Sequence, residues 1–523
     1  MSEFICSEWL RSSECIYGMC HLDILYMFLL FQTVQWTNRS SQVVHLYQST
    51  VVNIVSVHTV YLRSCIRQLI KLFIPDVPKK DGNSMEVEID EEAIVKHNTR
   101  FSHVHTLIKT IAKLVPMASK EVHTLLIDNY PYMTKSVYIL ECYLKNALQI
   151  TFYLPELRVQ ILELVIERVI KIDVHAPRLT ILAIEEQNET QESGIFCMDD
   201  TDPVTEMSRK LDVLMIQLFE YINVICVKNG ELDWEATKQL YRELLLVFEK
   251  VILPTYACCH VQFVMFYLVS LKMPLCDGFL DYLWKIVQNP NAHSVHRQSA
   301  VAYMGSLLAR AKFISTRTVM KTLELMVEWA HNYTKMCQDC LMADISRHGP
   351  FYSVCQSIFY TFAFRQKELL ETKTGLKWAS TLQFQHLIHS RLNPLKVCLP
   401  IIVKTFASVA RQHQLAFCDH IIEQNNRSFL PVEKGCIKNI LDTYFPFDPY
   451  LLKVSSKYIT PLYQEYENND FHDESSGEED EDEMFTEDVS SNNEISMTTE
   501  SIGGKGQLDL MQYGTSPGFQ HMC

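Results

Sequence analysis

Cysteine and histidine are the residues of this chain whose spacing comes nearest to that of a chemical site. Cys337 and Cys340 form a C-x-x-C pair, with His331 and His348 nearby, in the outline of a zinc site. A structural zinc site usually takes four ligands from two such pairs, and no second pair follows at that spacing. The sequence therefore predicts no bound metal.

The run Cys258-Cys259-His260 holds the residue types of a Cys–His nucleophile. It stands at the start of a strongly apolar segment, which favours packing in a core over catalysis. Neither H-E-x-x-H nor G-x-x-x-x-G-K-[ST] occurs in the chain. The sequence predicts that the protein is not an enzyme and that it needs no cofactor.

Charge is distributed unevenly along the 523 residues. The net charge is −15, but residues 467–500 hold 14 Asp and Glu and no Lys or Arg, so the rest of the chain is nearly neutral. A nearly neutral body predicts no strong direct DNA binding, because binding to phosphates needs an excess of positive charge. The longest apolar stretch, residues 24–31, is too short to cross a bilayer, so no membrane partner is expected.

Apolar residues recur at helical spacing through most of the chain, and Pro116, Pro131 and Pro155 fall between the predicted helices. Successive short helices, paired about every 35 to 45 residues, predict an all-α, HEAT-like α-solenoid of antiparallel helix pairs with a disordered acidic C-terminal tail. A compact pair of helical bundles is the alternative. The predicted segments are an atypical N-terminal extension (1–36), N-terminal repeats (37–184), an acidic disordered loop (185–207), C-terminal repeats (208–463) and the tail (464–523).

A group of basic residues lies where two predicted helices meet: Arg310, Lys312, Arg317 and Lys321. Their irregular spacing is typical of a solvated helix face, and a face that binds polyanions is the alternative. In the tail, Ser475 and Ser476 each precede several acidic residues, which suits a kinase with a basic substrate groove. Ser516 precedes Pro517 and is a second kind of phosphorylation candidate.

Several longer stretches, in the same order, resemble the RNA polymerase I-specific transcription initiation factor family. They lie between Trp36 and Tyr463, which is most of the chain. The stretches are CHVQFVMFYL (259–268), ARAKFI (309–314), HGPFYSVC (348–355), LNPLKVCLP (392–400), NNR (425–427), LP (430–431) and FPFDP (445–449).

The resemblance implies a non-catalytic HEAT-repeat factor with two docking surfaces. One surface would bind RNA polymerase I near its stalk region, and the other would meet the promoter core factor complex on ribosomal DNA. The resemblance also implies a location in the nucleus and nucleolus, and regulation by kinases. Residues 1–35 depart from the family's N-terminus.

Members of this family contact the polymerase through a serine-containing patch that phosphorylation gates. Ser119 and Ser136 are the polymerase-contact candidates that the resemblance implies here. Ser136 ranks first because Lys135 and Ser136 open the helix predicted to run to Tyr153, where a phosphate would be tolerated locally while altering a docking face. A HEAT-type nuclear transport or assembly adaptor is the alternative function.

Overall fold

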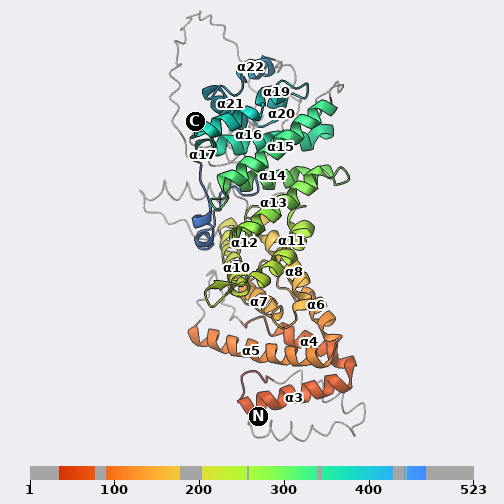
Figure 1. Cartoon of the computed structure of the whole chain (residues 1–523). Helices are drawn as coiled ribbons and strands as arrows, with labels where there is room; N and C mark the ends of the chain where they lie inside the picture. Colours follow the sequence, from red (N-terminus) through yellow and green to blue (C-terminus); the bar gives the residue numbers. More distant parts are fainter. Residues whose placement is uncertain are drawn as a thin grey trace, which may run out of the picture. The chain divides into compact units, whose positions relative to one another are not determined.

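The computed structural model describes residues 35–76, 90–176, 203–255, 258–337, 344–427, 441 and 445–466. Within these ranges nearly all regular structure is helical, so the prediction of an all-α fold is confirmed (Figure 1). The chain forms two compact units. Unit 1 comprises residues 1–277 and 450–461, and unit 2 comprises residues 278–449 and 462–523.

Unit 1 is built from helices that pack mainly on their neighbours in sequence. α4 packs against α6, and α10 packs against α7 and α8, as in the repeats of a solenoid. The helices are α3 (Ser41–Val57), η2 (Thr59–Tyr61), α4 (Leu62–Lys71), α5 (Glu91–Leu114), α6 (Ala118–Asp128), α7 (Val137–Ile150), η3 (Pro155–Leu157), α8 (Arg158–Val174), α10 (Pro203–Cys226), α11 (Trp234–Val247), the π-helical turn η4 (Phe248–Ile252), α12 (Phe263–Ser270) and η5 (Ser455–Tyr458).

The acidic loop predicted over 185–207 ends earlier than expected, because α10 begins at Pro203. Proline is favoured at the first position of a helix, where its missing N–H costs nothing, and Glu206 in the first turn suits the helix dipole. A small hairpin, β1 (Val227–Lys228) with β2 (Glu231–Leu232), follows α10. Its turn residues Asn229 and Gly230 have positive φ angles of 55° and 84°, the conformation in which Asn-Gly closes a tight hairpin.

Unit 2 is organised around the pair α14 and α16. The helices are α14 (Ser294–Arg310), α15 (Thr316–Met336), α16 (Ile345–Phe364), α17 (Gln366–Leu370), α18 (Lys373–Thr381), α19 (Phe384–Ile388), α20 (Pro394–Val397), α21 (Pro400–Gln412) and α22 (Asp419–Arg427). The helices α13 (Met273–Gln288) and η6 (Thr460–Leu462) span the unit boundaries. α16 is kinked at His348, two residues before Pro350. The backbone nitrogen of Pro350 carries no hydrogen and cannot donate a helical hydrogen bond.

The backbones of α14 and α16 approach closely because the contact residue is glycine. A Cβ added at Gly305 would lie 2.8 Å from Cβ of Ser357. Along α16, three side chains then donate to α14 carbonyls: Ser357 to Val301 (3.2 Å), Thr361 to Gly305 (3.2 Å) and Arg365 to Leu308 (3.0 Å). These bonds fix the register of the two helices.

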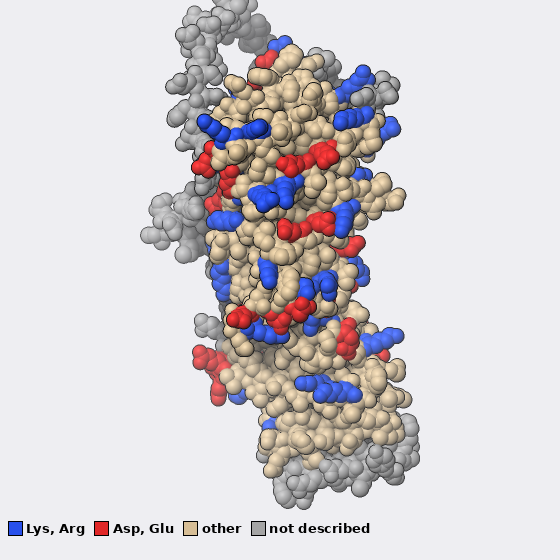
Figure 2. Space-filling view, in the orientation of Figure 1, with Lys and Arg blue, Asp and Glu red and all other residues tan. Residues whose placement is uncertain are grey.

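Arg310 corrects the prediction that residues 310–321 form one solvated face. Its side chain is 1% exposed and lies 3.8 Å from the carboxylate of Asp448. It also stacks over the rings of Phe364 and Tyr463, 4.7 Å and 5.3 Å from their centroids. Lys312, Arg317 and Lys321 are exposed, as expected. Lys/Arg and Asp/Glu residues are intermixed on the face of the molecule drawn in Figure 2.

Candidate functional site

Ser136 lies at the exposed start of α7. It occupies the N-cap position with extended backbone angles (φ −58°, ψ 153°), and its side chain makes no capping hydrogen bond. The first backbone N–H groups of a helix carry partial positive charge and attract anions. Ser136 therefore lies at the positive end of the α7 dipole.

Ser119 has a different setting in the first turn of α6. Its hydroxyl donates to Oε1 of Glu156 at 3.0 Å, and Glu156 follows the C-terminal end of α7. Ser136 precedes the other end of α7, a 14-residue helix that is roughly 21 Å long at 1.5 Å per residue. The two candidate serines thus lie at opposite ends of one helix and do not form a single patch.

A groove of about 960 Å³ lies between α5, α7 and α10, all within unit 1. Its lining includes Phe101 and Tyr138, together with the partly exposed Phe152 and Val224. Tyr138 is the first residue of α7 that lines the groove, and Ser136, two residues earlier, does not line it. The sequence analysis missed the groove, because its walls come from three helices that are separate in the sequence.

Two histidines of α5 connect to α7 at the groove. His97 Nδ1 lies 3.0 Å from the hydroxyl of Tyr138. His105 Nε2 lies 2.9 Å from Oδ1 of Asn146, whose amide nitrogen donates to a backbone carbonyl, so Nε2 carries the proton. His105 Nδ1 then accepts from the hydroxyl of Tyr153 at 2.9 Å. Burial lowers the pKa of His105 to about 4, and the hydrogen bond with Asn146 opposes this shift only in part.

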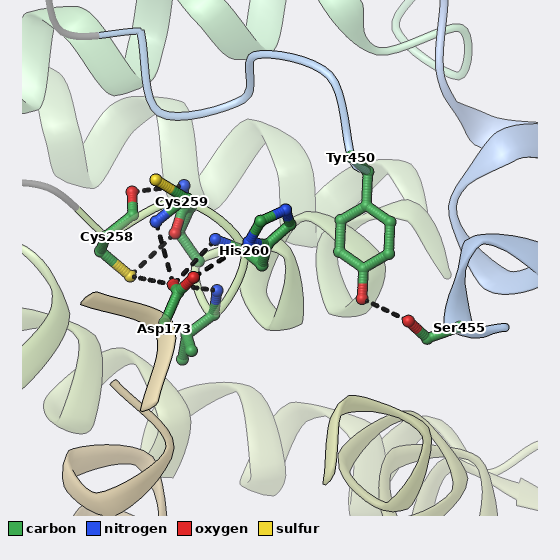
Figure 3. Close-up of polar contacts among 8 residues, drawn as sticks. Asp173, Cys258, Cys259, His260, Tyr450 and Ser455 are labelled. Carbon is green, nitrogen blue, oxygen red and sulfur yellow. Dashed lines mark hydrogen bonds and ion pairs between the residues drawn. The ribbon is translucent and has the colours of Figure 1, made fainter. Parts of the chain in front are cut away.

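The run Cys258-Cys259-His260 is held by a buried carboxylate rather than arranged as a nucleophile (Figure 3). Oδ2 of Asp173 accepts the backbone N–H groups of residues 259, 260 and 261 at 2.9, 2.8 and 3.1 Å, and Oδ1 lies 2.9 Å from Nδ1 of His260. The Cys258 thiol points to Asp173 and to Gln262. Because the thiol bonds to Asp173 and Gln262 and the imidazole bonds to Asp173, the carboxylate takes the place that a Cys–His pair would need.

The protonation states in this cluster also oppose nucleophilic chemistry. Burial, followed by the negative charge of Asp173, raises the pKa of Cys258 well above its ordinary value, so the thiol stays protonated. Burial would raise the pKa of Asp173 too, but hydrogen bonds from the His260 side chain and from the backbone outweigh it and lower that pKa. The cluster is a structural cap at the start of α12.

A second buried carboxylate performs a similar task nearby. Asp212 on α10 accepts the backbone N–H groups of Val454 and Ser455, both at 2.8 Å, and the hydroxyl of Ser455. The hydroxyl of Tyr450 lies 2.8 Å from that of Ser455, and the Tyr450 ring meets His260 edge-on at 5.5 Å (Figure 3). Residues 450–455 are thereby fixed onto the core of unit 1.

The other candidate metal ligands have protein partners. His331 Nε2 lies 2.9 Å from the carbonyl of Leu382, and His348 Nδ1 lies 2.9 Å from the hydroxyl of Tyr333. Cys340 lies outside the described residues. Within the part of the chain that the structure describes, no three His, Cys, Asp or Glu side chains gather as a metal site would require.

Three further observations concern the remaining expectations. No described helix is both long and apolar enough to pass through a bilayer. Ser475, Ser476 and Ser516 lie outside the described residues. Ser516 is also the centre of a G-x-S-x-G pattern, Gly514 to Gly518. A catalytic serine in this pattern lies on a turn between a strand and a helix, and residues 514–518 also lie outside the described residues.

The described residues thus form a helical scaffold whose polar clusters serve packing. This chain belongs to the family described as RNA polymerase I specific transcription initiation factor RRN3, which matches residues 28–470. The family's members are initiation factors rather than enzymes, which confirms the prediction that the chain is non-catalytic.

Individual relatives carry the same description. The RNA polymerase I-specific transcription initiation factor RRN3 of Mus musculus is 40% identical over 482 residues, which cover 85% of this chain and 73% of the relative. The corresponding factor of Schizosaccharomyces pombe is 28% identical over 490 residues, 86% of this chain and 77% of the relative. The crystal structure of RNA polymerase I transcription initiation factor Rrn3 shares the fold, with a TM-score of 0.71 at 23% identity over 89% of this chain and 90% of that one.

Proposed function

We propose that this chain binds RNA polymerase I and bridges it to the promoter-bound core factor complex on ribosomal DNA, acting in the nucleus and nucleolus. The observation that carries the proposal is the family match over residues 28–470, together with relatives named as polymerase I-specific initiation factors. A chain that bridges two large assemblies needs extended docking surfaces and no catalytic centre, which suits a scaffold of paired helices.

The polymerase-contact surface that we propose lies at the Ser136 end of α7. Ser136 is exposed there, next to Tyr132, which is 80% exposed, and next to the groove that begins at Tyr138. A phosphate on Ser136 would add roughly two negative charges at this end of the helix. The helix would accept that charge, whereas an apolar or acidic partner surface would not, so phosphorylation would release the polymerase.

Co-sedimentation of the purified chain with RNA polymerase I tests this proposal. We expect the wild-type chain to co-sediment and Ser136→Asp to reduce binding by at least tenfold. The N-cap carboxylate is compatible with the helix dipole, so circular dichroism should be unchanged. Ser380→Asp, an exposed helical serine of α18 in unit 2, is the matched control and should bind normally.

Two outcomes would contradict the proposal. A wild-type chain that fails to co-sediment with the polymerase would refute the bridging function, and capture of nuclear import cargo instead would support the transport adaptor. Binding that survives Ser136→Asp would refute only the role of Ser136. Ser119 would then be tested as Ser119→Ala, because an acidic residue there would repel Glu156 and disturb the fold.

Kinases complete the proposal as regulatory partners, acting on Ser136 and, in the tail, on Ser475, Ser476 and Ser516. Phosphopeptide mapping of the protein from growing and starved cells tests these sites.

Salt titration of DNA binding tests the expectation of no strong direct DNA contact. A protein using many phosphate contacts would lose several orders of magnitude in affinity as salt rises, and we expect no such loss.

A further inference from the structure

The point at which the acidic tail leaves unit 2 is fixed by the last described residues. Tyr463 forms a β-bridge with Ala311, and the backbone N–H of Gln464 donates to the carbonyl of Arg310 at 2.7 Å. The Gln464 side chain lies 2.6 Å from the guanidinium of Arg365. Tyr466, 8% exposed, packs against Phe364 with 5.4 Å between ring centroids. The tail therefore starts at the C-terminal ends of α14 and α16.

Exposed cations lie on the elements that hydrogen bonds connect to this exit segment. Lys312 donates its backbone N–H to Leu462, directly within the segment that leads to the exit. Thr316 donates to Glu368, which joins the start of α15 to α17, and Trp378 donates to Glu324, which joins α18 to α15. We call the exposed basic residues on these elements the cationic face: Lys312, Arg317, Lys321, Lys367, Lys373 and Lys377.

The positive charge of this face is only partly neutralised by the acids on the same elements. Apart from Lys367, its members form no ion pair with any residue that the structure describes. Of the nearby acids, Glu368 lies 2.7 Å from the Arg365 guanidinium, and Glu324 accepts from the Trp378 indole at 2.6 Å. Glu328, Glu371 and Glu465 are the other exposed acids of these elements and of the exit segment. With Arg365 included, seven Lys and Arg face five Glu, which leaves an excess of two positive charges.

The chain itself supplies the complementary charge at this position. Residues 467–483 contain ten Asp and Glu and no Lys or Arg, and they begin one residue after the buried Tyr466. An extended chain covers up to about 3.5 Å per residue, so residues 467–474 reach roughly 28 Å from the exit. One turn of α15, from Arg317 to Lys321, rises only about 6 Å. The acidic residues can therefore extend well beyond the first turn of α15.

We propose that residues 467–483 lie across the cationic face of the same chain and shield it from other anions. Tethering holds these residues at a local concentration on the order of millimolar, which favours the contact over free ligands. The contact is electrostatic and made between exposed groups, so salt should release it. This proposal concerns contacts within one chain and does not depend on polymerase binding.

Zero-length carbodiimide cross-linking of the full-length chain, followed by peptide mass spectrometry, tests the contact. We expect links from residues 467–483 to Lys321, Lys367, Lys373 and Lys377 at 50 mM salt, reduced at least fivefold at 500 mM salt. Lys396 and Lys404, exposed on α20 and α21 of the same unit, are internal controls and should link at least fivefold less. Equal linking to all exposed lysines would overturn the proposal.

A mixture of ¹⁴N- and ¹⁵N-labelled chains identifies the occupant. Links confined to peptides of one label support the proposal, and links between labels would assign the tail to a second copy and overturn it.

A full-length variant with residues 478–483 neutralised to Gln and Asn then tests the shielding. We expect it to bind fluorescent heparin about tenfold more tightly at low salt, and unchanged affinity would contradict shielding. Adding Lys321→Gln, Lys367→Gln, Lys373→Gln and Lys377→Gln should abolish the gain.

Discussion

The imidazole of His105 and the amide of Asn146 meet at 2.9 Å between α5 and α7, and the amide fixes which ring nitrogen is protonated. The neutral ring satisfies both neighbours, since its second nitrogen accepts from Tyr153. A charged ring would have to donate twice in a buried position. The pairing therefore links the packing of these two helices to pH.

The stability of unit 1 should fall on acidification because of His105. Its pKa is lowered from 6.5 to about 4 by burial, so between these values the unfolded chain binds a proton that the folded chain does not. The free energy of unfolding then rises with pH through this window, by roughly 3 kcal/mol in all, and the contribution is complete above pH 6.5. Amide hydrogen exchange of α5 and α7 between pH 4 and 7, corrected for intrinsic rates, measures it. His105→Gln should flatten the dependence, while His420→Gln, exposed on α22, should not.

Asp173→Asn should destabilise unit 1 strongly. Three backbone N–H groups and the His260 ring share its carboxylate, and an amide offers only one acceptor atom. We expect the free energy of unfolding to fall by about 3 kcal/mol, since charged hydrogen bonds of this kind contribute about 1.5–3 kcal/mol each and are not additive. Urea denaturation checks this. Asp281→Asn, exposed on α13, should change it by no more than about 0.5 kcal/mol. If the two substitutions changed the free energy of unfolding equally, the capping role of Asp173 would be contradicted.

Gly305→Ala should destabilise unit 2, although alanine is the better helix former. The new methyl would lie 2.8 Å from Ser357, and such overpacking costs about 1–3 kcal/mol, against a gain of about 1 kcal/mol in helix propensity. In a Ser357→Gly background the same substitution should become neutral or stabilising, because the clash is absent. Thermal unfolding of the four proteins of this double-mutant cycle measures the effect of Gly305→Ala in each background. A loss that is equal in both backgrounds would mean that another contact limits the approach of α14 and α16.

Arg310→Met should loosen the segment that holds Tyr463 and Asp448. Removing one partner leaves Asp448 buried without the guanidinium, which typically costs about 3–5 kcal/mol. Replacing both residues, as Arg310→Met with Asp448→Leu, should recover most of that loss because no isolated charge remains. Limited proteolysis between residues 445 and 466 reports on the segment. If the double variant is cleaved as fast as the single one, the Arg310 stacking on Phe364 and Tyr463 matters more than the ion pair.

The sequence predicted the helices well because their packing is largely local. Each amphipathic stripe records which face is buried, and neighbouring helices bury it. The starts of helices are harder to predict. The acidic composition around Pro203 predicts a loop, although proline often begins a helix, as it does here. Apolar spacing predicts a single helix over residues 351–371, but the structure has two helices there, α16 and α17, with the break at Arg365.

Polar contacts between distant segments could not be predicted. The sequence around Arg310 predicts a solvated face because its partner Asp448 lies more than a hundred residues later, and no local pattern connects them. The same limit hid the bonds of Asp173 and the groove along α7. Ser136 was correctly placed at a helix start from Lys135 and the apolar run after it, and its role in binding stays a prediction.

The bonds between Asp212 and Ser455 also bear on biosynthesis. Unit 1 includes residues 450–461, which come late in the chain. The unit can therefore be completed only after the ribosome has synthesised those residues. Until then Asp212 lacks its hydrogen bonds with Ser455, and the ring of His260 lacks its contact with Tyr450. Contacts this distant form slowly, so a nascent chain halted before residue 450 should depend on chaperones to stay soluble.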